Sequence, residues 1–432
     1  MAQLLIEGGT RLVGRVSISG SKNAVLPILA ACVLTDEECR IRNVPRIEDV
    51  NTMVGLLKGM GVQIRALDPH QLQVSAERLA RGEALANMAS RMRASFLLMG
   101  PLLARRGEAR VAKPGGDDIG MRRVEQHIIG LRRMGASVEL EDGEYVARAD
   151  RLKGAIVHLD MPTVTGTENL MMAAATADGV TTIHNAAREP HVVDLAMFLG
   201  KMGARISGIG TDILQIEGVR ELSGATHGVI PDNIEAGTYA MAIAATRGEA
   251  VLEDLDSADL DALVLKLRDA GIEVEEERHS LWIRGGSVLR PVDVTTWPHP
   301  GFPTDLQAPF VSLMTQAEGR CYVSEAVFEN RFQHVPELRK LGADVYVEGR
   351  TAIVTGRTPL HGGTVTAPDI RSGAALVVAA LCASGTTTVE NIYHLDRGYD
   401  DLVGKLEQLG ANVSRVDGAN EVRPDLSRVV GD

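Results

Sequence analysis

One pattern of apolar and polar positions recurs six times along the chain. Each copy has an apolar residue, two variable positions, a second apolar residue, a glycine and then alternating apolar positions, as in LRRMGASV and LRKLGADV. The glycines are Gly61, Gly135, Gly203, Gly271, Gly342 and Gly410, about 70 residues apart. Glycine commonly ends a helix in the left-handed conformation. The pattern therefore predicts six helices that end at these glycines, each followed at once by a strand.

The segment before each copy also recurs. A strand such as CRIRNV, TTIHNA or TTVENIY leads into a charged turn and an amphipathic helix. One unit is therefore a strand, a turn, a helix, a glycine and two or more strands, which is longer than a solenoid repeat of roughly 20–50 residues. We predict an α/β protein of six units, arranged in one ring or in two groups of three. Three ordinary α/β domains whose helices end alike are the alternative.

Composition narrows the classes of function. The 432 residues include 45 Lys and Arg against 57 Asp and Glu, which gives a net charge of −12. With 6 Phe, 6 Tyr and 2 Trp, the chain has neither the basic surface nor the aromatic rings typical of a nucleic-acid binder. No apolar run is long enough for a membrane span or an export signal. Four scattered cysteines fit a reducing compartment, so we expect a cytoplasmic protein with no nucleic-acid or membrane partner.

Common cofactor and nucleophile motifs are missing from the sequence. There is no GxxxxGK(S/T) phosphate loop, no GxGxxG after a strand, no HExxH and no GxSxG. The eleven histidines do not cluster with cysteines as zinc ligands do. We therefore expect no metal and no organic cofactor.

Two loops combine charged groups with glycines or a helix start. Lys22 follows the strand RVSISG, where a lysine can meet an anion at a helix N-terminus; a surface lysine is the alternative. Residues 113–123 combine paired glycines, the carboxylates Asp117 and Asp118, and paired arginines. Loops of this kind often carry function, and the alternative is a solvated, charged turn.

Three further loops place a charged side chain at a turn or helix start. In HPGFPTD the prolines can aim the carboxylate of Asp305, unless Thr304 or Asp305 caps the next helix. Arg371 and Arg397 are placed for a bidentate grip on a carboxylate or phosphate. Local salt bridges from each of these arginines to the aspartate just before it are the alternative.

Taken together, these stretches resemble the enolpyruvyl transferase family, which also contains EPSP synthase. The similarity runs from about residue 4 to residue 416 and is most specific in SGSKNAVLPILAA, PGGxxIGxR, TGTENLMMAA, FPTDLQA, VFENRFQHVPEL and YHLDRGY. It implies two domains, each an inside-out α/β barrel of three βαβαββ units, with the active site in the cleft between them. The first domain would be residues 22–229 with the catalytic loop 113–123, and the second residues 1–21 plus 230–418. Residues 419–432 carry no family motif and are predicted to be a disordered tail.

The resemblance also implies a reaction. The enolpyruvyl group of phosphoenolpyruvate would pass to the 3′-hydroxyl of UDP-N-acetylglucosamine with release of phosphate, by addition and elimination through a tetrahedral ketal. This is the first committed step of peptidoglycan synthesis, on which cell-wall growth, cell shape and division depend. By motif, Lys22, Arg122 and Arg397 would bind phosphoenolpyruvate, and Asp305 would accept the hydroxyl proton.

A larger set of residues would contact the nucleotide sugar, again by resemblance. These are Asn23, Arg91, Arg123, Val124, Glu125, Gln126, Thr163, Val164, Thr165, Asp305 and Val327.

Asp117 departs from the family at a catalytic position. Family members usually have a cysteine after the paired glycines, which donates a proton and is the target of the antibiotic fosfomycin; some members have aspartate. A carboxylic acid can deliver the same proton if a closed, anionic site raises its pKa. We therefore expect activity without sensitivity to fosfomycin.

Three other departures concern the acceptor. Arg123 replaces the usual proline, Glu125 the usual aspartate and Asn233 a common arginine. An added cation beside the nucleotide can change the nucleotide accepted, so transfer to another uridine nucleotide or nucleotide sugar is a second hypothesis. A catalytically inactive paralogue that binds a nucleotide sugar and regulates cell-wall synthesis is a third, and the retained Lys22 and Asp305 count against it.

Overall fold

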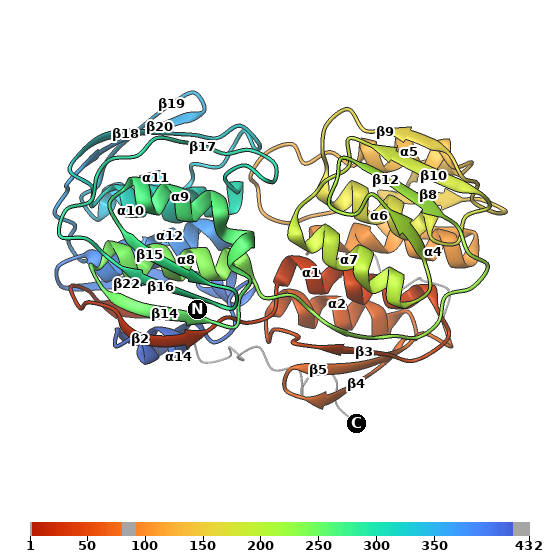
Figure 1. The fold of residues 1–432 in the computed structure, drawn as a ribbon, viewed down its shortest axis with the longest axis horizontal. Coiled ribbons are helices and arrows are strands. Elements are labelled where there is room, and N and C mark those ends of the chain that lie inside the picture. The colour runs from red at the N-terminus through yellow and green to blue at the C-terminus, as the bar shows by residue number, and fades with distance from the viewer. Residues whose placement is uncertain (1, 80–91, 418–432) are drawn as a thin grey trace. The chain divides into compact units, whose positions relative to one another are not determined.

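A computed structural model describes residues 2–79 and 92–417 of the chain (Figure 1). These residues divide into two compact units. Unit 1 comprises residues 2–19, Asp117–Arg122 and 231–417, and unit 2 comprises residues 20–79, 92–116 and 123–230. Residues 117–122 were expected with the first domain because of their place in the sequence; in the structure they group with unit 1, whose side chains hold them. The predicted tail 419–432 lies outside the described residues.

The described strands form six sheets, three in each unit, with one common strand order. In unit 1 the sheets, strand by strand, are β21 (Thr364–Thr366), β22 (Thr386–Glu390), β1 (Gln3–Glu7) and β23 (Asn412–Val416); β17 (Val294–Thr295), β18 (Gly319–Ser324), β20 (Thr351–Gly356) and β19 (Asp344–Glu348); and β2 (Val13–Ser17), β14 (Glu249–Glu253), β16 (Ser280–Arg284) and β15 (Glu273–Glu277). In unit 2 they are β13 (Thr226–Gly228), β3 (Cys39–Arg42), β5 (Gln71–Ser75) and β4 (Gln63–Asp68); β9 (Ile156–His158), β10 (Val180–His184), β12 (Ile213–Glu217) and β11 (Arg205–Ser207); and β6 (Glu108–Ala112), β8 (Glu144–Arg148) and β7 (Ser137–Glu141).

Every four-stranded sheet has the same pairing. Its first two strands are parallel and its other neighbours are antiparallel, as in β9–β10 and β10–β12–β11. The last repeat takes one strand from the opposite end of the chain, because β1 pairs with both β22 and β23. The predicted mixed α/β fold of six repeats, three in each unit, is confirmed.

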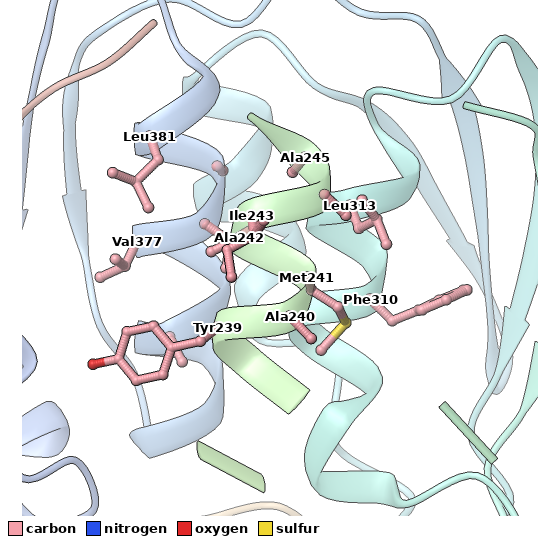
Figure 2. Close-up of a cluster of buried hydrophobic side chains, with 14 of the residues drawn as sticks. Tyr239, Ala240, Met241, Ala242, Ile243, Ala245, Phe310, Leu313, Val377 and Leu381 are labelled. Atoms are coloured by element: carbon pink, nitrogen blue, oxygen red, sulfur yellow. The ribbon is translucent and has the colours of Figure 1, made fainter. Parts of the chain in front are cut away.

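Six inner helices, three per unit, each precede one strand of a sheet, which is the second strand in the four-stranded sheets and β6 in the three-stranded sheet. They are α1 (Lys22–Ala31), α4 (Met99–Arg106), α6 (Val164–Ala174), α8 (Asn233–Ala245), α10 (Gln307–Met314) and α12 (Ile370–Cys382). In unit 1, α8, α10 and α12 pack on one another, and every residue of α10 is buried. Figure 2 shows Tyr239 and Met241 of α8, Phe310 of α10 and Val377 of α12 filling this core. No described helix is long and apolar enough to cross a bilayer.

Six outer helices complete the repeats. They are α2 (Glu48–Gly59), α5 (Glu125–Arg133), α7 (Pro190–Lys201), α9 (Asp261–Asp269), α11 (His334–Lys340) and α14 (Leu402–Gln408). Each ends two residues before one of the six repeated glycines, all of which have positive φ, and the next strand starts two residues after that glycine. After Gly203, for example, the N–H of Ala204 donates to the carbonyl of Leu199 at 2.9 Å, which is the Schellman pattern. The prediction of six glycine-terminated helices is confirmed.

Apart from the short segment 117–122, the chain crosses between the units after Ser19 and after Ile230. At each crossing the two segments are hydrogen-bonded to each other inside one unit. The N–H of Asp232 donates to the carbonyl of Ser19 in unit 1, and that of Ser21 to the carbonyl of Ile230 in unit 2, both at 2.8 Å. Strand β2 therefore lies in unit 1 although it precedes α1 of unit 2, and β13 lies in unit 2 although it precedes α8 of unit 1.

Two glycines three residues apart give a test of the helix ends. At Gly203, φ is +104°, so alanine should lower the free energy of unfolding by about 1–2 kcal/mol through backbone strain. At Gly200, inside α7, alanine should instead raise it by up to about 1 kcal/mol through helix propensity. An added Cβ meets nothing within 4 Å at either position, so packing does not confuse the comparison. Urea unfolding of both variants measures the two signs, and shifts in the same direction would contradict this account.

Candidate functional site

Six of the predicted site residues share a position in the repeat. They lie at the amino ends of inner helices, where unpaired backbone N–H groups and the helix dipole favour anions. They are Lys22 and Asn23 in α1, Thr163, Val164 and Thr165 at the start of α6, Asp305 just ahead of α10 and, among the departures from the family, Asn233 in α8. The repeat therefore places polar side chains at equivalent ends of several helices.

Asp305 is held between two arginines of unit 1. Its Oδ1 accepts a hydrogen bond from Nη2 of Arg331 at 2.6 Å, and its Oδ2 accepts bonds from Nη2 and Nε of Arg371 at 2.9 and 3.1 Å. Both guanidinium groups are buried, whereas the Asp305 side chain keeps 24% exposure. Asp305 lies in η4 (Thr304–Leu306), and no side chain caps η4 or α10. The carboxylate is fixed in direction and accessible, and the alternative of a helix cap is wrong.

Arg331 was not among the residues predicted from the sequence. Arg371 was predicted either to bind a carboxylate or phosphate or to form a local salt bridge. The expected local bridge from Asp369 to Arg371 is wrong, because Asp369 caps α12 by accepting the backbone N–H groups of Arg371 and Ser372 at 2.9 Å. Burial is the largest influence and lowers the pKa of Arg371, but Asp305, Tyr399 and Asp232 together outweigh it, and the pKa lies above its usual value. Within the described chain, Nε of Arg331 and Nη1 of Arg371 are buried donors without an acceptor. The signal for Arg331 was its place in VFENRFQHVPEL.

Asp117 pairs with Arg397 in unit 1. Nη1 of Arg397 donates to Oδ1 of Asp117 at 2.5 Å, and Nδ1 of His394 lies 3.7 Å from the same oxygen. Both side chains are largely buried. Asp396, expected as a local partner for Arg397, receives two bonds from Arg415, at 2.6 and 2.9 Å. Two predicted catalytic residues, 280 positions apart in sequence, are thus in direct contact.

Residues 329–333 hold the loop that carries Asp117. The backbone N–H of Met121 donates to Oε1 of Glu329 at 2.7 Å, and Nδ2 of Asn330 donates to the carbonyl of Asp118 at 3.0 Å. Nε2 of Gln333 donates to the same carbonyl. These bonds explain why residues 117–122 belong to unit 1, and none of the three anchoring side chains was predicted.

Arg122 completes a cluster with an excess of positive charge. Burial lowers the pKa of Arg122, Arg331 and Arg397 lower it further, and the carboxylates Asp117 and Asp305 oppose this. Four guanidinium groups, counting Arg371 beside Asp305, therefore lie near Asp117 and Asp305 in unit 1, and Asp232 also acts on Arg371. Such a concentration of guanidinium groups is suited to a small ligand with several negative charges.

Lys22 and Asn23 lie in unit 2. Nζ of Lys22 is 2.9 Å from Oδ2 of Asp49, and both side chains are largely buried. Asn23 is half-buried beside it. The alternative of a freely exposed lysine is wrong, because the ammonium is oriented by a carboxylate that sequence analysis did not single out.

The start of α6 is tied to α5 through a buried histidine. Thr163 caps α6 by accepting the N–H of Gly166 at 3.3 Å. Thr165 Oγ1 lies 3.2 Å from Nε2 of His127, whose Nδ1 lies 3.1 Å from Nδ2 of Asn169. Burial lowers the pKa of His127 to about 3, so the ring is neutral and its two nitrogens serve the hydrogen-bond network.

The other predicted contacts to a nucleotide sugar are distributed over both units. In unit 2, the side chains of Arg123 and Glu125 are exposed, Val124 is buried, and Gln126 makes two hydrogen bonds with Asp160. In unit 1, the N–H of Val327 donates to Oε1 of Glu325 at 2.8 Å. Arg91 lies outside the described residues.

No group of three or more His, Cys, Asp or Glu side chains in the described ranges is arranged to hold a metal ion. The cluster around Asp117 and Asp305 in unit 1 therefore offers two kinds of functional group. Its arginines can bind and stabilise negative charge, and its carboxylates can accept or donate protons.

Comparison with known proteins identifies the family. The sequence profile of the EPSP synthase (3-phosphoshikimate 1-carboxyvinyltransferase) family matches residues 6–406. The chain belongs to this family. The prediction of an enzyme of the enolpyruvyl transferase family is thus confirmed.

Two curated relatives match this enolpyruvyl transferase over nearly their full lengths. A UDP-N-acetylglucosamine 1-carboxyvinyltransferase from Sorangium cellulosum is 51% identical over 420 residues, covering 97% of this chain and 99% of the relative. A UDP-N-acetylglucosamine 1-carboxyvinyltransferase 2 from Carboxydothermus hydrogenoformans is 47% identical over 418 residues, covering 96% and 100%.

Solved structures agree with the fold. The enolpyruvyl transferase NikO from Streptomyces tendae superposes with a TM-score of 0.87 at 28% identity, covering 96% of this chain and 99% of its own. EPSP synthase from Acinetobacter baumannii superposes with a TM-score of 0.75 at 19% identity, covering 96% and 100%, which supports the fold alone.

The buried His127 gives this enolpyruvyl transferase a predictable acid sensitivity. Its pKa is about 3 in the folded protein and 6.5 ordinarily, so below pH 6.5 only the unfolded chain takes up the proton. The free energy of unfolding should therefore fall by about 1.4 kcal/mol per pH unit from this residue alone, between pH 6.5 and 3. His127→Gln should remove that part of the slope in urea unfolding at pH 6.5 and pH 4.5. His361→Gln, at an exposed position, is the matched control, and equal slopes in all three proteins would contradict the assignment.

Proposed function

We propose that this protein transfers the enolpyruvyl group of phosphoenolpyruvate to the 3′-hydroxyl of UDP-N-acetylglucosamine and releases inorganic phosphate. The observation that carries the proposal is the cluster of Arg122, Arg331, Arg371 and Arg397 around Asp117 and Asp305. Phosphoenolpyruvate carries a carboxylate and a phosphate close together, which suits a site with surplus guanidinium groups. The names of the two relatives at 51% and 47% identity support the choice of acceptor.

Binding of phosphoenolpyruvate makes use of donors that the protein leaves available. Nε of Arg331 and Nη1 of Arg371 have no acceptor among the described residues, and a buried donor without a partner is costly. We assign these two groups, with Lys22, Arg122 and Arg397, to the carboxylate and phosphate of phosphoenolpyruvate. An anion at Arg397 takes over the contact that this arginine otherwise makes with Asp117.

The addition step forms a bond between the sugar oxygen and C2 of phosphoenolpyruvate. The hydroxyl proton passes to Asp305, whose direction is set by Arg331 and Arg371. The methylene carbon C3 takes a proton from Asp117, so that the product of this step is a tetrahedral ketal. In the elimination step C3 returns a proton to Asp117, the double bond forms again, and the bond from C2 to the phosphate oxygen breaks as the leaving phosphate takes the proton held by Asp305. The guanidinium groups stabilise the negative charge that develops in both steps.

Asn23, Arg91, the segment 123–126, Thr163–Thr165 and Val327 are proposed to bind the nucleotide sugar. One departure from the family sequence, at Arg123, supports the hypothesis of a second acceptor. The side chain of Arg123 is exposed, and it places a cation at a position where the family usually has proline. Phosphate release with UDP-N-acetylglucosamine, measured beside plain uridine nucleotides and other uridine nucleotide sugars, separates the two acceptors. Binding of the nucleotide sugar without any release of phosphate would favour the hypothesis of an inactive, regulatory paralogue. If the protein is active, we expect it to work in the cytoplasm on peptidoglycan precursors.

The base assignment predicts the effect of Asp305→Asn. The amide cannot accept the hydroxyl proton, so kcat should fall about 10²–10⁴-fold. Calorimetric affinity for UDP-N-acetylglucosamine should stay close to that of the wild type. A variant with unchanged kcat would show that another group is the base.

The identity of residue 117 predicts the response to fosfomycin. This epoxide requires a thiolate, and the four cysteines, Cys32, Cys39, Cys321 and Cys382, lie outside the loop and are at most partly exposed. The wild type should therefore keep its activity during prolonged exposure. Asp117→Cys should become inactivated and gain the mass of the drug, because Arg397 beside residue 117 stabilises a thiolate.

Asp118→Cys is the matched control for this experiment. Asp118 is exposed and neighbours Asp117, but only its carbonyl is held by unit 1. A cysteine there should react much more slowly. Equal rates at positions 117 and 118, or inactivation of the wild type, would contradict the assigned environment of Asp117.

A further inference from the structure

Glu325 is a buried carboxylate that no step of the proposed reaction uses. It follows β18 directly and keeps 2% exposure. Its Oε1 accepts the backbone N–H groups of Val327 and Phe328 at 2.8 and 2.9 Å. Its Oε2 accepts the hydroxyl of Thr304 at 2.8 Å. In the described part of the chain no Lys or Arg forms an ion pair with this carboxylate, so neutral donors satisfy it.

Thr304 connects Glu325 to the proposed base. The hydroxyl donates its one proton to Glu325, and its oxygen accepts a bond from Nη1 of Arg331 at 3.0 Å. The other terminal nitrogen of the same guanidinium, Nη2, donates to Oδ1 of Asp305 at 2.6 Å. Because a carboxylate is only an acceptor, Glu325 sets the direction of the Thr304 hydroxyl and leaves its lone pair to Arg331.

A second connection reaches the same guanidinium. The Phe328 ring, whose backbone N–H is bound by Glu325, lies under Arg331 with 5.2 Å from Cζ to the ring centroid. Glu325 therefore binds the Thr304 hydroxyl and the backbone of Phe328, the two residues that flank Arg331. Residues 329–333 continue from this turn to hold the loop of Asp117.

We propose that Glu325 is a positioning residue for the reaction, which it serves without touching substrate. Through Thr304 and Phe328 it orients Arg331 on Asp305, so that the carboxylate faces the hydroxyl that it deprotonates. This inference rests on the proposed function, in which Asp305 is the base. It assigns Glu325 an effect on proton transfer beyond the folding of its own turn.

Glu325→Gln is the direct test because it keeps the size of the side chain. The glutamine oxygen can still accept the N–H groups of Val327 and Phe328, but its NH₂ group donates to Thr304 and reverses that hydrogen bond. Arg331 must then compete for the Thr304 oxygen and loses its fixed contact with Asp305. We expect kcat to fall about tenfold, as for one lost hydrogen bond to a charged group, with the KM for the nucleotide sugar nearly unchanged.

The pH–rate profile distinguishes positioning from a structural role. Arg331 and Arg371 donate hydrogen bonds to Asp305, and the charges of Arg122 and Asp305 act on each other. Weakening the Arg331 contact makes protonation of the carboxylate easier, so the acidic limb of the kcat profile should move to higher pH. A purely structural defect would reduce the folded fraction and leave this limb where it is.

Thr304→Val provides a second variant that leaves Glu325 and its turn intact. It removes the hydroxyl and should move the acidic limb in the same direction as Glu325→Gln. The double variant should be no worse than the more damaging single variant, because both changes interrupt one connection. Glu318→Gln, at an exposed position ahead of β18, is the matched control and should behave as wild type.

The outcomes separate this inference from the proposed function. A wild type that releases no phosphate from phosphoenolpyruvate with any acceptor overturns both. If the wild type is active but the folded variants Glu325→Gln and Thr304→Val leave the acidic limb of the kcat profile unchanged, the role of Glu325 alone is overturned. The same holds if the effects of the two substitutions on kcat add in full in the double variant. If Glu325→Gln does not fold, as judged by circular dichroism, the position of the acidic limb in the kcat profile of Thr304→Val is the test.

Discussion

The fold and the position of its candidate site depend on one constraint: the inner helices have almost no polar face and must be enclosed. In α8, α10 and α12 nearly every residue is buried, so these helices must lie against one another and beneath sheets. Their only accessible parts are their ends. Polar side chains that serve chemistry are consequently placed at the amino ends, where helix dipoles favour negative charge. The same constraint, repeated in each unit, accounts for the equivalent positions of Lys22, Thr163 and Asp305.

Features set by local sequence could be predicted, and features set by distant contacts could not. The six glycines were found because a left-handed residue after a helix is a local requirement. The pairing of Asp305 with Arg371 joins residues 66 positions apart, and each arginine had an aspartate nearby in sequence that offered a simpler partner. Asp369 was instead used to cap α12, which left Arg371 for Asp305. The interaction of Lys22 with Asp49 was likewise invisible, since nothing in the segment around Asp49 marks it as a partner.

The family resemblance compensated for part of this gap but not for all of it. It selected Asp117, Arg122, Asp305 and Arg397, and the structure gathers these four residues in unit 1. It did not select the residues that fix them, such as Arg331 and Glu329. Supporting residues carry no chemical signature of their own, because an arginine that orients a carboxylate has the same side chain as one on the surface. Only the three-dimensional contacts distinguish the two cases.

The presence of aspartate at position 117 is physically consistent with the surrounding charge. The four guanidinium groups near Asp117 and Asp305 repel one another, and each carboxylate lowers this repulsion. Asp117 reduces this repulsion in the absence of ligand by binding Arg397. In the proposed reaction an anionic ligand reduces it in the same way, so substrate and Asp117 compete for one cation. Release of Asp117 from Arg397 would then coincide with the arrival of the anion whose methylene carbon needs a proton. The released carboxylate must take up that proton before it donates it, so a carboxylate at this position would join substrate binding to the availability of the acid.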